Sequence, residues 1–392
     1  RGKRMRNMLK SMALVVASVG AASSLAIGPV QAQDDHSVVI VMPDEPNGLD
    51  SCVTTLAATG RITKNNVFET LTRVDTTDGS VQPVLATSWE RIDDLTWRFK
   101  LVENATFHDG TPFNAEAVVF NIERLMNPAM ECFDYNSSFQ GYQVSAVAVD
   151  DYTVDIKTDR PAPILPTSMT AIAIASPNTL IDTAVREPVG TGAYKFVEWI
   201  PGERVVIERA DNYWGEPVEV TKATYVFRAE SAVRAAMVAA GEADIASSIS
   251  VQDATNPETD FAYLNSETTR LRIDLNQPPL DDLRIRLALN YAVDRDAIQG
   301  SILSEDAIQA TQYVVPGTLG HNPNLEPYPY DVEKARGLIA EAQAEGVAVD
   351  TPIRLLGRTD NYPNVAELME ALVAMYADAG LNVQLEMLEA AN

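Results

Sequence analysis

Few side chains in this sequence are suited to acid–base or metal chemistry, and they are scattered along the chain. The three histidines are His36, His108 and His321, and the two cysteines are Cys52 and Cys132. They form no cluster with the spacing of a tetrahedral zinc site, so we expect no metal. His108 stands in the stretch FHDG, where it is either a general base or a neighbour of an Asp109–Gly110 hairpin turn. We favour the turn.

The sequence contains none of the short motifs that build common catalytic sites. It has no G-x-S-x-G, H-E-x-x-H, G-x-x-x-x-G-K-[ST] or C-x-x-C. The stretch VGTGAY lacks the third glycine of a nucleotide-binding loop, and we interpret it as a tight turn in which no Cβ fits. Carboxylates are abundant, but no pattern pairs two of them as in a glycosidase. We therefore expect neither an enzyme nor a cofactor.

Length and charge limit the classes of partner. The chain has 392 residues, enough for two or three domains, and its formal net charge is −25. Nucleic-acid binding depends on basic patches that neutralise phosphates, so we expect no nucleic-acid partner. This excess of acidic over basic residues suits a soluble protein outside the cytoplasm.

The first 32 residues have the pattern of a secretory signal peptide. A basic stretch, RGKRMRNMLK, precedes an apolar run, and the small residues Val30 and Ala32 stand before a cleavage point at Gln33. A membrane anchor is the alternative, but the run is short and rich in Ala, Ser and Gly.

The predicted export bears on the two cysteines. In an oxidising compartment we expect Cys52 and Cys132 to form a disulfide. On the chain-entropy model a bridge that closes such a loop adds about 4–5 kcal/mol to the free energy of unfolding. The alternative is two buried free thiols.

Strands and helices alternate in the pattern of an α/β protein. The expected strands include Ser37–Met42, Thr96–Leu101, those of the hairpin Val189–Gly215, TPIRLLGR and LNVQLEML. The expected helices include Arg61–Leu71, one capped by Asn114, one capped by Asp281 or Asp282, one capped by Asp294, VEKARGLIAEAQAEG and VAELMEALVAMYADAG. We expect residues from about 69 to 189 to form an inserted α+β subdomain.

A sharp break stands between a strand-like run and a helix. The run RLRIDLN ends at Asn276 and meets Pro278 and Pro279, which cannot donate to a strand ladder. The break is either a hinge between two lobes or an ordinary loop, and Asn276 either ties the hinge or caps the turn.

The order of several segments carries the most specific signal. The sequence reads VFETLTRVDTTDG, TWRFKLVENATFHDGTPFNAEAVVFNIERL, PVGTGAYKFVEW, ADNYWGEP, VAAGEADI, LNQPPLDDLRIRLALNYAVDRDAI and VPGTLGHNP in succession. This order resembles the family 5 extracellular solute-binding proteins, the receptors of ABC importers for peptides, nickel and related solutes. The resemblance covers Val38 to Asn392. One departure is Ala117, where the family usually has an acid.

The resemblance implies a bilobal periplasmic-binding-protein-like fold, with two α/β lobes, a hinge and the inserted subdomain in the first lobe. We place lobe one at residues 33–271 and lobe two at 272–392, and we expect the end of lobe two to lie beyond Asn392. In such folds the ligand lies between the lobes, in contact with loops at strand ends.

Two loops become candidate ligand sites through the resemblance. In LAATGRITKN, Thr59 and Gly60 offer backbone groups and Arg61 a charge, unless this is simply a surface loop. In GRTDNYPN, Arg358 and Tyr362 match the residue types that hold the ligand carboxylate in dipeptide receptors, although their spacing is wider. A solvated Arg at a strand end is the alternative for Arg358.

We therefore expect a monomeric periplasmic binding protein without enzymatic activity, which delivers a small polar solute or peptide to an ABC permease. Two alternatives remain, an extracellular hydrolase and a chaperone-like accessory protein. Nickel is disfavoured as the solute because the histidines do not cluster.

Overall fold

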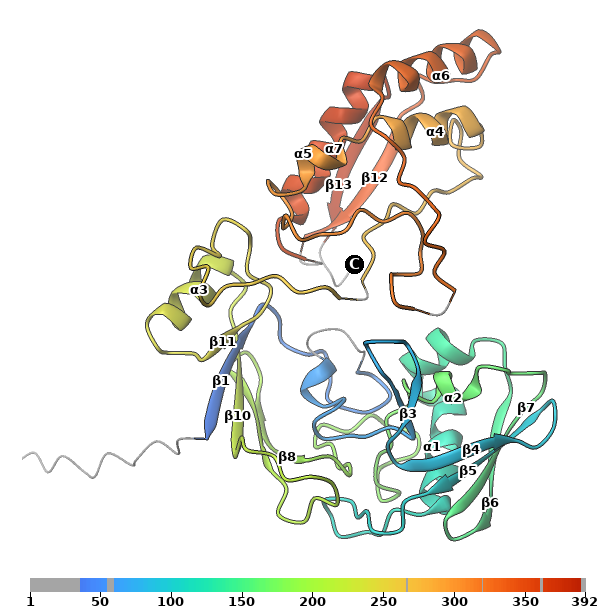
Figure 1. Ribbon diagram of the computed structural model, residues 1–392, viewed down its shortest axis with the longest axis vertical. Coiled ribbons are helices and arrows are strands. Elements are labelled where there is room, and N and C mark those ends of the chain that lie inside the picture. The colour runs from blue at the N-terminus through green and yellow to red at the C-terminus, as the bar shows by residue number, and fades with distance from the viewer. Residues whose placement is uncertain (1–35, 55–59, 266, 319, 360–361, 389–392) are drawn as a thin grey trace, which may run out of the picture. The chain divides into compact units, whose positions relative to one another are not determined.

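The computed structural model describes residues 36–54, 60–265, 267–318, 320–359 and 362–388 (Figure 1). The predicted signal peptide and Thr59 lie outside these residues. Across the described ranges, no helix combines the length and apolar character needed to cross a bilayer.

One five-stranded sheet joins the start of the chain to residues far along it. Its strands are β1 (Ser37–Met42), β8 (Tyr194–Ile200), β9 (Arg204–Arg209), β10 (Lys222–Phe227) and β11 (Ile245–Ala246). The order is β11-β1-β10-β9-β8, with β1 parallel to both of its neighbours. Buried Val205 and Ile207 of β9 pack with side chains of β1 and β10 to build its core. The chain between β1 and β8 therefore leaves this sheet and returns to it.

The intervening segment builds an antiparallel sheet with its own core. Its strands are β4 (Ala86–Arg91), β5 (Thr96–Leu101), β6 (Val144–Asp150) and β7 (Thr153–Thr158), in the order β4-β5-β7-β6. Helix α1 (Ala115–Met126) packs against β6. Asn114 caps α1 as predicted, because its side chain accepts a hydrogen bond from the Ala117 amide. Phe99, Val118 and Ile122 are fully buried in the core that helix and sheet share.

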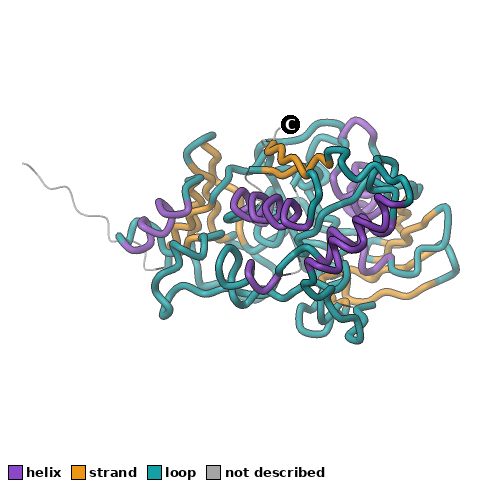
Figure 2. Tube along the Cα trace, turned by 90° about the horizontal axis from the view of Figure 1, so that it is seen from above, coloured by secondary structure: helices purple, strands orange, loops and turns teal. Residues whose placement is uncertain are grey.

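Shorter elements connect these parts. They are β2 (Thr72–Val74), β3 (Val81–Pro83), α2 (Leu165–Ser168), α3 (Ser231–Ala239), the 3-10 turns η1 (Gly60–Ile62) and η2 (Pro128–Met130), and the π-helical turn η3 (Tyr135–Phe139). Loops make up much of the remaining chain (Figure 2).

The last part of the described chain forms a separate apolar core. Its elements are α4 (Leu283–Tyr291), α5 (Arg295–Ile298), α6 (Val332–Ala344), β12 (Ile353–Arg358), α7 (Val365–Ala379) and β13 (Val383–Leu388). Strands β12 and β13 pair in parallel, and α7 between them packs on both. Asp282 caps α4 and Gly380, with φ +94°, ends α7, as the sequence predicts.

Two predicted elements are wrong. The expected helix Arg61–Leu71 is a 3-10 turn followed by irregular turns. Asn65 has a left-handed backbone, φ 76°, and the carbonyls of Asn66 and Val67 accept hydrogen bonds from the 190s loop instead of from a helix. Those carbonyls are thus committed to tertiary contacts.

The strand-like run that ends at Asn276 is also not a strand. Its residues form no ladder with any described strand, and Leu271 and Leu275 are exposed. The apolar alternation that suggested a strand does not suffice, because a strand needs a hydrogen-bonded neighbour. The following Pro278–Pro279 bond is cis.

Candidate ligand-binding site

Arg358 is the last residue of β12. In the register of the parallel pair it lies opposite Leu388, and its side chain is exposed. In open α/β sheets, ligands bind outside the carboxyl ends of parallel strands. A guanidinium at this point offers a planar fork of donors to a carboxylate. The position therefore fits the predicted role for Arg358.

Tyr362 lies in the same loop but is less accessible. Its ring packs against the core of α4, α6 and α7, and burial raises the pKa of its hydroxyl. The ring of Tyr362 is thus committed largely to packing within the protein.

The second predicted loop offers fewer groups than expected. The Gly60 carbonyl accepts a 3.0 Å hydrogen bond from the Lys64 amide, and the Arg61 carbonyl accepts one of 2.8 Å from the Asn66 side chain. Those backbone acceptors are therefore already engaged. The exposed side chain of Arg61 is what this turn presents.

Asn276 makes local hydrogen bonds within its own turn. Its backbone amide and its side-chain amide both donate to the Asp274 carboxylate, at 3.0 and 3.1 Å. Its role in binding or at a hinge stays a prediction. The predicted site residues thus occupy three separate stretches of sequence, with only Arg358 and Tyr362 in one loop.

A partly buried carboxylate, Glu69, joins three segments of the chain, although no sequence motif marks it. Glu69 accepts hydrogen bonds from the Thr191 hydroxyl (2.8 Å), the Tyr213 hydroxyl (2.9 Å) and the Trp214 indole (2.7 Å). Burial nevertheless raises the pKa of Glu69, because desolvation outweighs these bonds. The sequence signal was present, since the stretches VFETL, GTGAY and NYWG each supply a partner, but the contact itself was not predictable.

The two glycines of VGTGAY let this loop approach another backbone. A Cβ on Gly190 would lie 2.0 Å from the Val67 carbonyl oxygen, and one on Gly192 would lie 2.1 Å from that of Asn66. No side chain fits there, as the interpretation of a tight turn requires.

His108 packs against the same loop. Its Nε2 donates to the Gly192 carbonyl at 2.8 Å, while the buried Nδ1 has no partner among the described atoms. Burial lowers the pKa of the imidazole. The following turn has Gly110 at φ +84°. These contacts give His108 a packing role beside the turn.

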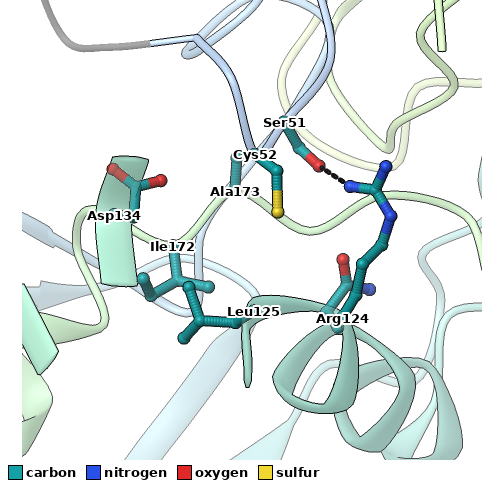
Figure 3. Close-up of a pocket in the computed structure, with 8 residues that line it drawn as sticks. Ser51, Cys52, Arg124, Leu125, Asp134, Ile172 and Ala173 are labelled. Atoms are coloured by element: carbon teal, nitrogen blue, oxygen red, sulfur yellow. Dashed lines mark hydrogen bonds between the residues drawn. The ribbon is translucent and has the colours of Figure 1, made fainter. Parts of the chain in front are cut away.

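Cys52 and Cys132 form a disulfide with Cα atoms 4.5 Å apart. Two buried ion pairs flank it: Arg124 with Asp50 at 2.7 Å, and Lys64 with Asp134 at 2.6 Å. A cavity beside the disulfide, lined by Ser51, Cys52, Arg124 and Asp134 among others, measures about 10 Å³ (Figure 3). That volume holds about one water molecule, so the cavity is no solute site.

Among residues 36–388 that the structure describes, no three His, Cys, Asp or Glu side chains gather in a way that would hold a metal ion. The polar group that the candidate site offers to a solute is the Arg358 guanidinium.

Comparisons with known proteins agree on the family. Residues 80–392 match the model of the bacterial extracellular solute-binding proteins, family 5. The glutathione-binding protein GsiB of Pectobacterium atrosepticum is 31% identical over 320 residues, 78% of this chain and 61% of that protein. The dipeptide-binding protein of Escherichia coli is 24% identical over 97% of this chain and 76% of its own length. The chain thus spans about three fifths of the length of the glutathione-binding relative.

Solved structures share the fold. NikZ of Campylobacter jejuni in complex with Ni(L-His) has a TM-score of 0.76 at 23% identity, over 91% of this chain and 74% of that one. DppA of Helicobacter pylori in complex with the peptide STSA has a TM-score of 0.75 at 22% identity, over 90% and 74%. These similarities confirm the predicted periplasmic-binding-protein-like α/β fold. With the family match, they establish that the chain belongs to the family 5 bacterial extracellular solute-binding proteins.

Proposed function

We propose that the full-length protein is the solute receptor of an ABC importer. It captures a small polar solute between two lobes, which include residues 33–271 and residues 272–392, and passes it to the membrane permease. Ligand that contacts both lobes stabilises the closed form by its higher affinity for that form. The role is binding without catalysis, as a monomer, in the periplasm after removal of residues 1–32.

The observation that carries this proposal is the place of Arg358. An exposed guanidinium stands at the carboxyl end of β12, and the chain continues through a short loop into the N-terminus of α7. The helix dipole and the guanidinium both favour an anion in their neighbourhood. A carboxylate-bearing solute therefore suits this loop.

The solute class rests on the same chemistry. Relatives are named for binding glutathione and dipeptides, which both carry carboxylates and an amine. We propose a peptide or a related amino- and carboxyl-bearing compound, such as an opine. Haem and nickel, named for other members, are the less favoured classes.

A thermal-shift assay of the wild type and of Arg358→Gln with glutathione, dipeptides, oligopeptides and opines tests the proposal directly. A ligand at about 100 times its dissociation constant adds roughly 2.7 kcal/mol to the free energy of unfolding. We expect one class to raise the melting temperature of the wild type, and Arg358→Gln to lose most of that shift.

The matched control is Arg354→Gln. Arg354 is exposed on the same strand and pairs with Glu386 across the sheet, so its loss should leave the ligand shift intact. Equal ligand shifts in the wild type and Arg358→Gln would contradict the role of Arg358. Turnover of a chromogenic substrate would favour the hydrolase, and binding of unfolded chains without a saturable small ligand would favour the accessory protein.

A further inference from the structure

Three parallel strands end side by side in the five-stranded sheet. Strands β10 and β11 flank β1 and run parallel to it. The Arg228 amide donates to the Met42 carbonyl at 2.8 Å, and the Ser247 amide donates to the Val41 carbonyl at 3.1 Å. The chain therefore leaves β10 and β11 on either side of the end of β1. In open α/β sheets, ligands bind outside such carboxyl ends.

A buried cation holds the two segments that follow these strands, residues 228–230 and 247–249, which we call the exit segments. Arg234 lies in α3, which packs on β1 and β11 (Figure 1). Its side chain is buried. The guanidinium donates to four carbonyls, those of Arg228 (2.8 Å), Ala229 (2.6 Å), Ser247 (3.1 Å) and Ser248 (2.5 Å). Because its donors have a fixed planar geometry, one side chain fixes both exit segments.

The exit segment after β11 has two features that need such support. Ser248 has a left-handed backbone, φ 55°, which is uncommon for a residue with a side chain. The Ser247 hydroxyl is buried and has no hydrogen-bond partner among the atoms that the structure describes. Both features are unfavourable, and they persist where the surrounding structure holds them and often serve binding. Arg234 bonds the carbonyls of both residues and so holds this conformation.

The same bonds leave the amides of the exit segments available. A trans peptide directs its N–H opposite to its C=O, so carbonyls that meet at Arg234 direct the following amides away from it. These are the amides of Ala229, Glu230, Ser248 and Ile249. Within the described part of the chain, none of the four donates a hydrogen bond. They are therefore donors that this edge of the sheet can offer to a solute.

The charges around Arg234 limit what these amides can bind. The carboxylates of Asp44, Glu230 and Asp253 all act on the guanidinium electrostatically. One cation and three carboxylates leave the edge with a net negative charge, which disfavours a carboxylate there. The uncharged carbonyl of a peptide bond carries no such penalty. The amides therefore suit a solute carbonyl, while the carboxylate of the solute suits Arg358.

We propose that Arg234 is a positioning residue, which holds both exit segments so that their amides bond carbonyl groups of the solute in the first lobe. The effect on binding rests on the proposed function. The effect on the exit segments depends on no solute, so the two can be tested separately.

Arg234→Lys tests the proposal with the charge retained. Lysine has three donors on one atom and cannot bridge four carbonyls on two segments. In the ligand-free full-length protein, the hydrogen-bonded amides of Arg228, Ser247 and Ser250 should exchange faster with deuterium. The dissociation constant for glutathione or for a dipeptide should rise about tenfold, the effect of losing one to two hydrogen bonds. Arg234→Met should give a larger rise.

The control is Arg98→Met in β5. Arg98 donates two hydrogen bonds to Asp155, at 2.7 and 2.9 Å, so its loss should destabilise the inserted subdomain. It should change neither exchange at the exit segments nor the dissociation constant. This comparison separates positioning from general destabilisation, because a purely structural role for Arg234 would move the melting temperature in both variants and the dissociation constant in neither.

Three outcomes decide the proposal. Unchanged exchange at both exit segments in Arg234→Lys would overturn it. Faster exchange with an unchanged dissociation constant would overturn the role in binding. If the wild type binds neither glutathione nor any dipeptide, the proposed function fails for these solutes and the role in binding fails with it, while the exchange experiment still decides whether Arg234 holds the exit segments.

Discussion

The Trp214 indole donates a 2.7 Å hydrogen bond to the Glu69 carboxylate, 145 residues earlier in the chain. Thr191 and Tyr213 complete the set of donors to this carboxylate. Glu69 comes after β1, and its three donors flank the hairpin of β8 and β9. One partly buried side chain therefore ties the start of the inserted region to its end.

Glu69→Gln and Glu69→Leu should therefore differ strongly. Glutamine can accept from the indole and Thr191 and donate to the Tyr213 oxygen, so we expect a small change. Leucine leaves three donors without an acceptor, and at about 1–3 kcal/mol for each unsatisfied group we expect a loss of about 3 kcal/mol or more. Urea unfolding measures both variants. Equal stabilities would show that the carboxylate is not a structural tie.

Glu69 also predicts a pH dependence. Its pKa is raised on folding, so the folded state holds the proton more tightly than the unfolded state does. The resulting stability is full below the unfolded pKa of about 4.5 and is lost as pH rises through the folded pKa. Glu69→Gln removes this dependence. The difference in unfolding free energy between variant and wild type, measured from about pH 4 upward, should change over that window and nowhere else.

His108 predicts the opposite kind of window. Burial lowers the pKa of the imidazole and outweighs the hydrogen bond to the Gly192 carbonyl, which raises it; Lys195 lowers the pKa further and Asp109 raises it. The unfolded state takes up a proton as pH falls through about 6.5 and the folded state does not, so stability falls below that pH. His108→Gln keeps a donor for the Gly192 carbonyl and should flatten the stability curve as pH falls below about 6.5. An unchanged curve would contradict the buried, neutral imidazole.

The ion pair of Arg124 and Asp50 is fully buried. Arg124→Met leaves the Asp50 carboxylate without its cation, and we expect a loss of about 3–5 kcal/mol. The double variant Arg124→Met/Asp50→Leu should recover part of that loss, because no charge remains buried alone. A double-mutant cycle by chemical unfolding gives the coupling. Additive effects would mean that the two side chains act independently.

Removal of the disulfide should destabilise the same region. Cys52 and Cys132 are 80 residues apart in sequence, and Cys52→Ala/Cys132→Ala should cost about 4–5 kcal/mol on the loop-entropy model. Thiol titration of the denatured wild type should find no free thiol without reductant. Two titratable thiols would show that the pair is not bonded in the isolated protein.

Local sequence signals predicted the helices and strands better than they predicted the tertiary contacts. Asn114, Asp282 and Gly380 mark helix ends through chemistry within a few residues, and the helices begin or end where those residues predict. The helix expected from Arg61 failed because the carbonyls of that stretch bond to the Gly192 and Tyr194 amides, which no local pattern reveals. Arg358 was singled out through the resemblance of GRTDNYPN to a segment of dipeptide receptors, and its role stays a prediction. The Glu69 contacts were not predicted, because their partners lie more than 100 residues away.

The full-length protein should bind one small solute reversibly. Titration calorimetry with glutathione, a dipeptide series and opines, run beside Arg358→Gln, tests this most directly. We expect a saturable isotherm of one solute per protein for one of these classes, weakened about tenfold or more in Arg358→Gln and unchanged in Arg354→Gln. Absence of saturable binding across the whole panel, or an isotherm indifferent to Arg358, would contradict the receptor function.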